Sequence, residues 1–398
     1  MRITQGMEQS QFLTALNQLE SGISATQNGI SSGLAFTTAS QDPVAAGLVN
    51  GYNQVLAQSQ QYTANGQSAQ GSLNIEDNAL TQVQTQLQSL RDLALQANNA
   101  TVSGANLSAI ATQVQSIQQS LLSIANTQDG TGSYIFAGYS TQTQPFAQTA
   151  TGASYAGDQG QRQVQLAAGQ TVVVGDNGDA VFNQIKTGNG TFTVTPNNAI
   201  NTGTGIIGAT SATNPATYGG ASYTIQFTAP NAYEVLNSAN VSVSTGTYTS
   251  GQAISYGGFQ VTISGAPATG DQFAVAPSTN QSVFTTVQNL ANALQQGSSA
   301  TSGSTQLNNS IANAIDNIDQ ALGQVQTVQS SVGARLNTIT AQQSAATTQQ
   351  TQLKQSVSNL QSLDYPSAIT SLDSQNTTLS AAMQAYTLTQ GLSLFKYL

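Results

Sequence analysis

The sequence predicts an α+β multidomain protein: a long antiparallel α-helical bundle with coiled-coil contacts, formed from both chain ends, and an inserted, mainly β central domain. Three observations predict this fold class. Apolar residues recur at helical spacing over residues 12–124, and an apolar heptad repeat continues through residues 311–364. Residues 134–284 hold 16 of the 24 Phe and Tyr residues and 6 of the 8 Pro residues, which is typical of a turn-rich β region.

These composition changes divide the chain into three expected domains. Residues 1–42 with 365–398 form terminal helices, residues 43–133 with 285–364 a long-helix bundle, and residues 134–284 a β-rich domain. Burying one Leu contributes roughly 1.5–3 kcal/mol, whereas ordering one residue costs about 1–2 kcal/mol. For a helix that has a narrow apolar face and packs against only one other helix, the gain from burial and the cost of ordering nearly cancel. We therefore expect the terminal helices to be mobile in the monomer and ordered on assembly.

The N-terminal block carries the apolar period of amphipathic helices. Spacings of 3, 4 and 7 link the first set, which is Phe12, Leu16, Leu19, Ile23 and Ile30. Two further sets alternate spacings of 3 and 4: Leu80, Val83, Leu87, Leu90, Ala94 and Ala97, then Leu107, Ile110, Val114, Ile117, Leu121 and Ile124. Small residues at 100–104 separate these two sets, so we expect a helical hairpin there.

The central segment is expected to form strands. Alternating or β-branched residues mark seven candidates, at residues 164–166, 172–174, 191–195, 222–228, 241–244, 259–264 and 272–276. Asn177-Gly178 between two apolar runs predicts a hairpin, because Asn-Gly is preferred in two-residue turns. The flanking Asp176 and Asp179 lack the distal Glu of a calcium loop, so a tight turn is the better interpretation.

The C-terminal block carries the strongest signal. Every seventh residue from Ile311 is apolar, giving Ile311, Ile318, Val325, Val332, Ile339, Ala346, Leu353 and Leu360. The companion series, four residues on, includes Leu336 but is only half apolar, with Gln329, Gln343 and Gln350 within it. A strict heptad repeat with a narrow seam predicts one helix over 311–364, roughly 80 Å long, in coiled-coil contact. The Gln-rich flanks suggest hydrogen-bonded packing against further chains.

A last helix is expected after a break at Tyr365-Pro366, because Pro suits the first turn of a helix and disfavours helical geometry in the residue before it. Leu372, Leu379 and Tyr386 lie seven residues apart, with Met383 beside them. Five of the seven residues 392–398 are large and apolar.

Composition excludes many functions. The chain has no His and no Cys, which excludes thiol and imidazole catalysis, disulfides, and zinc, haem or iron–sulfur sites of the usual kind. Its seven Lys and Arg residues are dispersed and its net charge is −9, which argues against nucleic-acid binding. No stretch resembles a cleaved signal peptide or a transmembrane helix.

Carboxylates give no clear sign of catalysis. Glu76 and Asp77 lie at the start of a predicted helical run, where they would complement the helix dipole. A glycosidase needs two carboxylates in one cleft, and the scattered acidic residues do not indicate one. We therefore expect no catalytic residue, cofactor, metal site, nucleic-acid partner or membrane partner.

Several motifs resemble the flagellin superfamily. They are residues 33–43 (GLAFTTASQDP), residues 73–101, and Asp364-Tyr365-Pro366. Three further motifs resemble hook–filament junction members of the superfamily rather than filament flagellins: Met1-Arg2-Ile3-Thr4 with Met7, Tyr134-Ile135-Phe136-Ala137-Gly138 with Pro145-Phe146, and Ser393-Leu394-Phe395-Lys396-Tyr397-Leu398. Lys396 stands where an acidic residue is common in the family. The resemblance is loose over residues 146–284.

The resemblance implies a structural subunit of the extracellular bacterial flagellum, exported by the type III apparatus without a cleaved signal. Its implied partners are further copies of itself in a ring, hook-associated protein 1, flagellin and an export chaperone. The terminal helices would form the axial core, with the helix over 311–364 as the next shell and the β domain outside. Expected axial contacts are Leu16, Leu19, Ile23, Leu372, Leu379, Met383, Leu394 and Phe395; the expected helical-shell residues are Ile318, Val325, Val332 and Leu336.

Three alternatives remain open at this point. The chain could be filament flagellin itself, although its tail motif argues against that. It could be a secreted adhesin whose aromatic-rich β domain binds a glycan or a host protein. A carboxylate-dependent hydrolase is the least favoured of the three.

Overall fold

The computed structural model describes residues 5–99, 102–299 and 304–391. The chain divides into two compact units. We call residues 1–64 with 342–398 the terminal unit, and residues 65–341 the central unit. The two longest helices, α2 (Pro43–Ala97) and α6 (Ser304–Gln361), contribute residues to both units.

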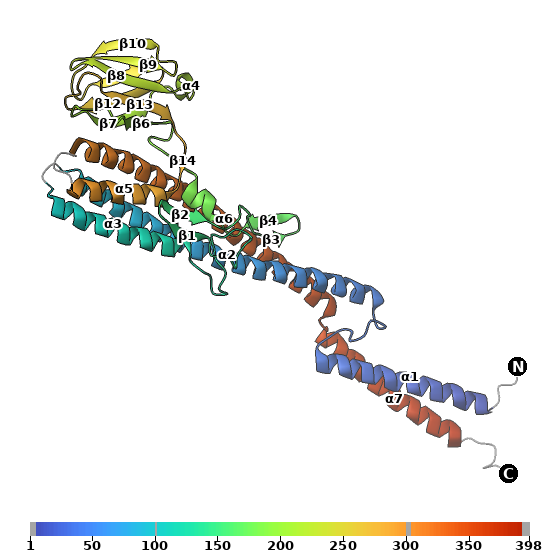
Figure 1. Cartoon of the computed structure of the whole chain (residues 1–398). Coiled ribbons are helices and arrows are strands. Elements are labelled where there is room, and N and C mark those ends of the chain that lie inside the picture. Colours follow the sequence, from blue (N-terminus) through green and yellow to red (C-terminus); the bar gives the residue numbers. More distant parts are fainter. Residues whose placement is uncertain (1–4, 100–101, 300–303, 392–398) are drawn as a thin grey trace. The chain divides into compact units, whose positions relative to one another are not determined.

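The terminal unit contains the helices α1 (Gln5–Ser32) and α7 (Tyr365–Gly391), which lie side by side and antiparallel (Figure 1). Backbone hydrogen bonds tie the two connecting segments together: Leu363 N donates to Gly33 O at 3.0 Å, and Ala35 N donates to Gln361 O at 2.7 Å. The break expected at Tyr365-Pro366 is confirmed, since α6 ends at Gln361 and α7 begins at Tyr365.

A small core joins the first turns of α2 to the end of α6. Asp42 caps α2, because its Oδ1 accepts hydrogen bonds from the backbone N of Val44 and Ala45. The buried residues of this core are Phe36, Ala45, Ala46 and Val49, with Val357 and Leu360 packed against them. Gln350 Nε2 donates to Ser59 Oγ and Thr63 Oγ1, each at 3.1 Å.

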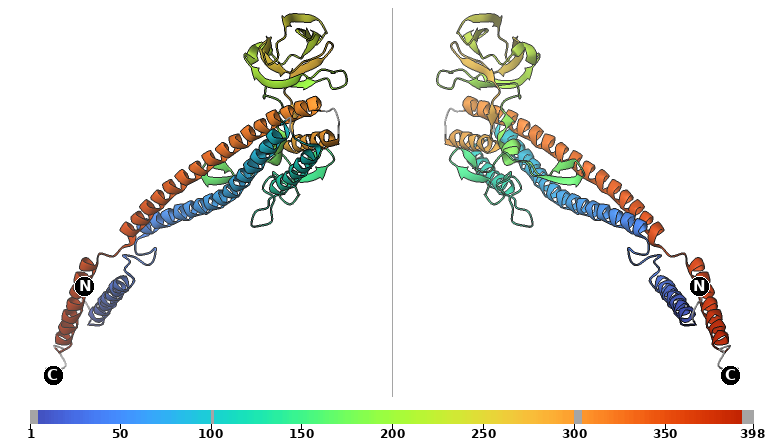
Figure 2. Two further views of the ribbon diagram at one scale, coloured as in Figure 1. Left: turned by 90° about the vertical axis from the view of Figure 1, so that its left-hand side faces the viewer. Right: turned by 90° about the vertical axis from the view of Figure 1, so that its right-hand side faces the viewer.

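The central unit is built on four helices, the central parts of α2 and α6 together with α3 (Gly104–Ala125) and α5 (Val283–Ser299). The predicted helical hairpin is confirmed, since α2 ends at Ala97 and α3 begins at Gly104, with Ser103 as its N-cap. The heptad positions of α6 from Ile311 to Ile339 are buried in this core, so the predicted seam is confirmed. Figure 2 shows α2 and α6 running alongside each other.

Gln in the companion series has partners within the same chain. Gln329 Nε2 donates to Asp77 Oδ1 and Thr81 Oγ1 of α2, each at 3.1 Å, and Gln350 makes the equivalent bonds described above. At these two positions the hydrogen-bonded packing expected between chains is therefore formed between α2 and α6 of one chain.

The central β segment divides between two cores. Two hairpins, β1 (Phe146–Thr149) with β2 (Gly152–Tyr155) and β3 (Gln163–Ala167) with β4 (Gln170–Val173), belong to the helical core together with the π-helical turn η1 (Asp179–Asn183). Phe182 packs edge-on against Phe136 and Phe146, with ring centroids 5.2 and 5.4 Å apart. The short pair β5 (Ile185–Lys186) and β14 (Asn280–Gln281) leads into the second core.

The second core forms a separate β domain within the central unit (Figure 1). A five-stranded antiparallel sheet has the order β10-β9-β8-β13-β6, and a three-stranded sheet the order β11-β12-β7. The bounds are β6 Phe192–Pro196, β7 Ile206–Ala212, α4 Pro215–Tyr218, β8 Tyr223–Ala229, β9 Ala232–Asn237, β10 Ser242–Thr247, β11 Ala253–Tyr256, β12 Phe259–Ser264 and β13 Gln272–Pro277. Buried Asn309 of α6 binds this domain, accepting from Ile207 N at 2.8 Å and donating to Gly205 O at 3.1 Å.

The seven predicted strands are confirmed as β3, β4, β6, β8, β10, β12 and β13.

The predicted Asn177-Gly178 hairpin is wrong, because β4 ends at Val173 and residues 179–183 form η1. Asn177 Oδ1 instead accepts from Ala180 N at 2.9 Å, and Gly178 N donates to Phe136 O at 2.7 Å. The dipeptide therefore starts a helical turn. The predicted position of Glu76 at a helix start is also wrong, since it lies inside α2.

Candidate assembly surface

The α1–α7 pair is held by a narrow seam. Leu16 and Leu19 of α1 and Leu372 and Leu379 of α7 are each half-buried, and Ile23 is buried. Phe12 stacks on Tyr386 with ring centroids 4.4 Å apart and planes 7° apart. Thr26 Oγ1 donates to Gln375 Oε1 at 3.2 Å. One face of each helix is thus used, which follows from an apolar stripe only about one residue wide per turn.

The eight predicted axial residues fall into three groups according to where they lie in the structure. It brings Leu16, Leu19, Ile23, Leu372 and Leu379 onto the two seam-forming helices. It leaves Met383 47% exposed. The last two predicted contacts, Leu394 and Phe395, lie outside the described residues. An axial role for any of these residues stays a prediction.

A second set of apolar side chains in the terminal unit is left open to solvent. We call this set the exposed apolar surface: Met7, Leu13, Val44, Leu48, Val55, Tyr365, Ile369, Met383 and Leu388. The set contains nine of the thirteen exposed large apolar side chains of the described residues, although the terminal unit holds less than a third of the chain. Exposed apolar side chains are thus concentrated in the terminal unit, which makes this set the candidate for contacts with other chains.

Few charges accompany this surface. From Pro43 to Ile75, α2 has no charged residue, and α7 has only Asp373 between Tyr365 and Gly391. Helix α1 carries Glu8 and Glu20. Along α2 and α7 this set of side chains therefore offers apolar contact and uncharged hydrogen-bonding groups, chiefly Gln, Ser and Thr.

The predicted helical-shell residues are occupied within their own chain. Ile318, Val325 and Val332 are buried in the core of the central unit, and Leu336 packs partly buried against it. These side chains hold α6 in the helical core. Whether that helix forms a shell in an assembly stays a prediction.

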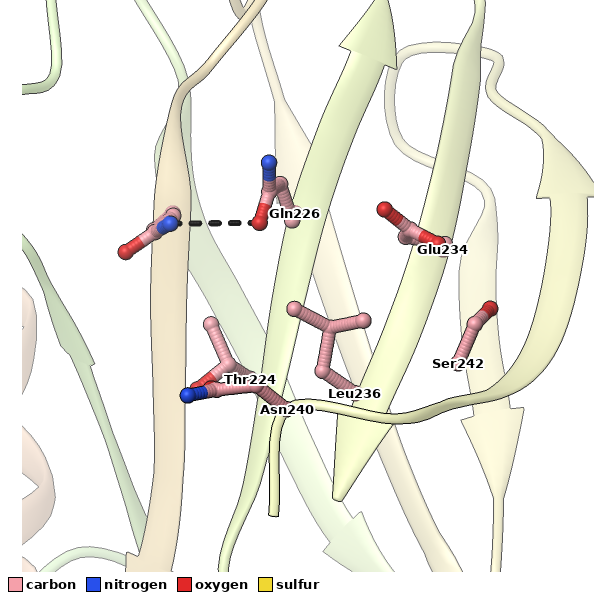
Figure 3. Close-up of a pocket in the computed structure, with 7 residues that line it drawn as sticks. Thr224, Gln226, Glu234, Leu236, Asn240 and Ser242 are labelled. Atoms are coloured by element: carbon pink, nitrogen blue, oxygen red, sulfur yellow. Dashed lines mark hydrogen bonds between the residues drawn. The ribbon is translucent and has the colours of Figure 1, made fainter. Parts of the chain in front are cut away.

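A hollow of about 550 Å³ lies on the exposed face of the five-stranded sheet (Figure 3). Its lining residues are Thr224, Gln226, Glu234, Leu236, Asn240, Ser242 and Gln272. Gln272 Nε2 donates to Gln226 Oε1 at 3.2 Å, as the dashed line shows. Glu234 is the one ionisable group among the lining residues, so this hollow does not offer the two carboxylates of a glycosidase.

A buried ionic cluster in the central unit was missed by sequence reasoning. Arg335 of α6 forms two hydrogen bonds of 2.9 Å to the Asp176 carboxylate, and Asp176 N donates to Glu76 Oε1 at 3.0 Å. Glu76 is 1% exposed. Burial, followed by the neighbouring Asp176 carboxylate, raises the pKa of Glu76 to about 8. These three residues are far apart in the sequence, and no local pattern connects them.

The described residues contain no group of three or more His, Cys, Asp or Glu side chains that could hold a metal ion. None of the helices in the described part of the chain is both long and apolar enough to cross a membrane.

Comparison with known proteins places both helical blocks in one family. The bacterial flagellin N-terminal helical region matches residues 3–141, and the bacterial flagellin C-terminal helical region matches residues 315–398. Flagellar hook-associated protein 3 of Salmonella typhimurium is 34% identical over 185 residues, which cover 46% of this chain and 58% of that protein. Its Escherichia coli counterpart is 35% identical over 39% of this chain and 49% of that protein. The chain thus spans about half the length of these curated relatives.

Solved structures resemble the chain over a greater length. FlgL of Xanthomonas campestris is 34% identical with a TM-score of 0.71, covering 77% of this chain and 99% of that one. The flagellar junction protein FlgL of Legionella pneumophila is 29% identical with a TM-score of 0.72, covering 79% of this chain and 100% of that one. The Salmonella and Legionella relatives are named as flagellar proteins. The chain therefore belongs to the flagellin superfamily, within its FlgL-type group.

Proposed function

We propose that this chain is a structural subunit of the bacterial flagellum that joins the hook to the flagellin filament. It acts by assembly and not by catalysis. The exposed apolar surface of the terminal unit is the observation that carries the proposal, because it is unused within the chain and free of charge over long stretches.

Assembly would cover this surface. Burying apolar area contributes about 25 cal/mol per Å², so helices of neighbouring copies packed around α1 and α7 would add stability that a two-helix pair lacks. The axial contacts proposed above belong to this step: five of those residues already line or adjoin the seam, and Met383 is open for a neighbour.

The proposed partners are further copies of this chain in a ring, hook-associated protein 1 on the hook side and flagellin on the filament side. An export chaperone would hold the terminal helices before assembly. The proposed location is the extracellular flagellum, reached by type III export. A chain without Cys, whose described residues include no group of side chains that could hold a metal ion, is compatible with passage in an unfolded state.

Deletion of the gene in its host tests this function. We expect intact hooks without attached filaments, and flagellin monomers released into the medium, with both defects corrected by the wild-type gene. Filaments of normal length on the deletion strain would overturn the proposal. A filament composed mainly of this chain would instead support the filament-flagellin alternative, which the names of the relatives favour less.

A further inference from the structure

The Glu76 carboxyl group occupies an unusual site inside the central unit. Glu76 lies within α2 and is 1% exposed, whereas most Glu side chains on a helix reach water. Its Oε1 accepts from Asp176 N at 3.0 Å. Its Oε2 is buried without a hydrogen-bond partner among the described residues. A carboxylate with one free, buried oxygen is costly, whereas a protonated carboxyl group has no net charge to desolvate.

The charges around Glu76 do not balance an ionised side chain. Asp176 Oδ1 accepts from Gln161 Nε2 at 3.0 Å and from Arg335 Nη2 at 2.9 Å, and its Oδ2 accepts from Arg335 Nη1 at 2.9 Å. The guanidinium of Arg335 thus forms a bidentate ion pair with Asp176. The neighbouring Asp77 on α2 accepts a hydrogen bond from Gln329 Nε2 of α6. Ionised Glu76 would place a second carboxylate beside one guanidinium.

The cluster joins three parts of the central unit. Glu76 comes from α2, Arg335 from α6, and Asp176 from the segment 174–178 between β4 and η1. The same segment is fixed at its two ends by backbone bonds, from Val174 N to Arg162 O at 2.9 Å and from Gly178 N to Phe136 O at 2.7 Å. Between these ends, Asp176 binds both long helices: its backbone N donates to Glu76 of α2, and its carboxylate accepts from Arg335 of α6.

We propose that Glu76, Asp176 and Arg335 form a proton-dependent clasp that holds the segment 174–178 against α2 and α6 and loosens when Glu76 loses its proton. The charged groups that face Glu76 are Asp176 from the segment and Arg335 from α6. This inference goes beyond the proposed junction function and does not depend on it.

The direction of the pH effect can be worked out. The pKa of Glu76 is raised from its ordinary value of 4.5 to about 8 in the folded chain, so folding takes up a proton between these two values. The stabilisation is therefore fully present below about pH 4.5 and is lost as the pH rises through about 8. The clasp is closed in neutral and acidic conditions and weakens in alkaline ones.

The small number of glutamates makes a direct test practical. The chain has only Glu8, Glu20, Glu76 and Glu234, so the full-length protein labelled with carboxyl-¹³C glutamate gives four side-chain signals. We expect one signal to move with a midpoint near pH 8 and to be absent from the Glu76→Gln variant. If no signal that disappears in this variant moves between pH 7 and 9, the proposal is wrong. Should Glu76→Gln fail to fold, substitution of the other three glutamates assigns the signal by elimination.

The opening of the clasp has its own readout. Between pH 6.5 and 9 we expect the midpoint of thermal unfolding to fall in the wild type and to stay level in Glu76→Gln. Asp316→Asn is the matched control, because burial and then Asp319 raise the pKa of Asp316 only to about 6, below this window. The control should therefore keep the wild-type slope. An equal slope in wild type and Glu76→Gln would overturn the clasp, whether or not the chain assembles.

Discussion

The two units of this molecule use apolar residues in opposite ways. In the central unit, the largest fully buried side chains are eight Phe residues, one Tyr residue and three Leu residues, spread over two cores. In the terminal unit, only seven described apolar side chains are buried and four of these are Ala, while nine large apolar side chains are exposed. The central unit therefore buries its largest apolar side chains within the chain, whereas the terminal unit leaves many of its own exposed.

Geometry explains this difference. A helix in a four-helix core has neighbours on several sides, so a wide apolar face can be buried. In an isolated pair such as α1–α7, each helix contacts one neighbour, and side chains outside the seam stay in water. Apolar residues are thus buried inside the central unit, whereas residues of the same types stay exposed in the terminal unit.

The largest expected effect is on the aromatic centre of the central unit. Phe182 is 1% exposed and packs among Phe136, Phe146 and Phe284. Phe182→Ala removes this ring and leaves a cavity, so we expect a loss of about 3–5 kcal/mol in the free energy of unfolding. Urea unfolding followed by tyrosine fluorescence measures it, since eight of the thirteen tyrosines belong to this unit.

Val241→Ala is the control for this change. Val241 is an exposed apolar residue of the same unit, and its truncation should alter the free energy of unfolding by less than about 0.5 kcal/mol. A loss below about 1 kcal/mol for Phe182→Ala would show that the central unit does not depend on its aromatic core, and would remove the contrast with the terminal unit.

Much of this contrast could be predicted from the sequence. Helical and heptad periods are local, so residues 311–339 revealed both the α6 helix and its buried face, and β-branched runs located seven strands. The alternation of apolar and polar residues also identified Leu16, Leu19 and Ile23 as one face of α1. What was predictable depends on neighbours within one or two turns of the chain.

Long-range contacts could not be predicted in this way. Glu76 and Asp176 are 100 residues apart, and Asp176 and Arg335 are 159 apart, so no sequence window contains the clasp. Asn177-Gly178 was misread because Gly178 is bound to Phe136, a tertiary contact that overrides the local turn preference. The division of the β segment into two cores was likewise hidden, because both parts have similar aromatic and glycine-rich composition.

An intermediate effect on the free energy of unfolding is expected from the two ion pairs found among the described residues of the central unit, because the pairs differ in burial. Side chains of Arg335 and Asp176 are 18% and 8% exposed, whereas those of Arg91 and Asp319 are 39% and 42% exposed. Arg335→Ala leaves a buried carboxylate without its cation, and should cost about 2–3 kcal/mol. Arg91→Ala should cost about 0–1 kcal/mol, because that pair is solvated. Equal losses in urea unfolding at pH 7 would show that burial does not separate the two pairs.

The smallest effect on the free energy of unfolding is expected for an exposed residue of the proposed assembly surface, Met383. Met383 is 47% exposed on α7, and Ile200 is 45% exposed in the central unit. Met383→Gln and Ile200→Gln should each change the free energy of unfolding of the monomer by less than about 0.5 kcal/mol. Only Met383→Gln should weaken self-assembly, measured by sedimentation of the purified chain, and filament attachment when it replaces the wild-type gene.

The matched pair separates three explanations of the exposed apolar surface. If both variants assemble like the wild type, Met383 is not a contact residue, although the rest of the surface could still be tested position by position. If both variants assemble poorly, exposed apolar side chains act through general adhesion wherever they lie, and the terminal unit has no special role. A defect confined to Met383→Gln, with monomer stability unchanged, would assign the defect to a lost contact between chains, because the two substitutions remove similar apolar area from surfaces of similar exposure.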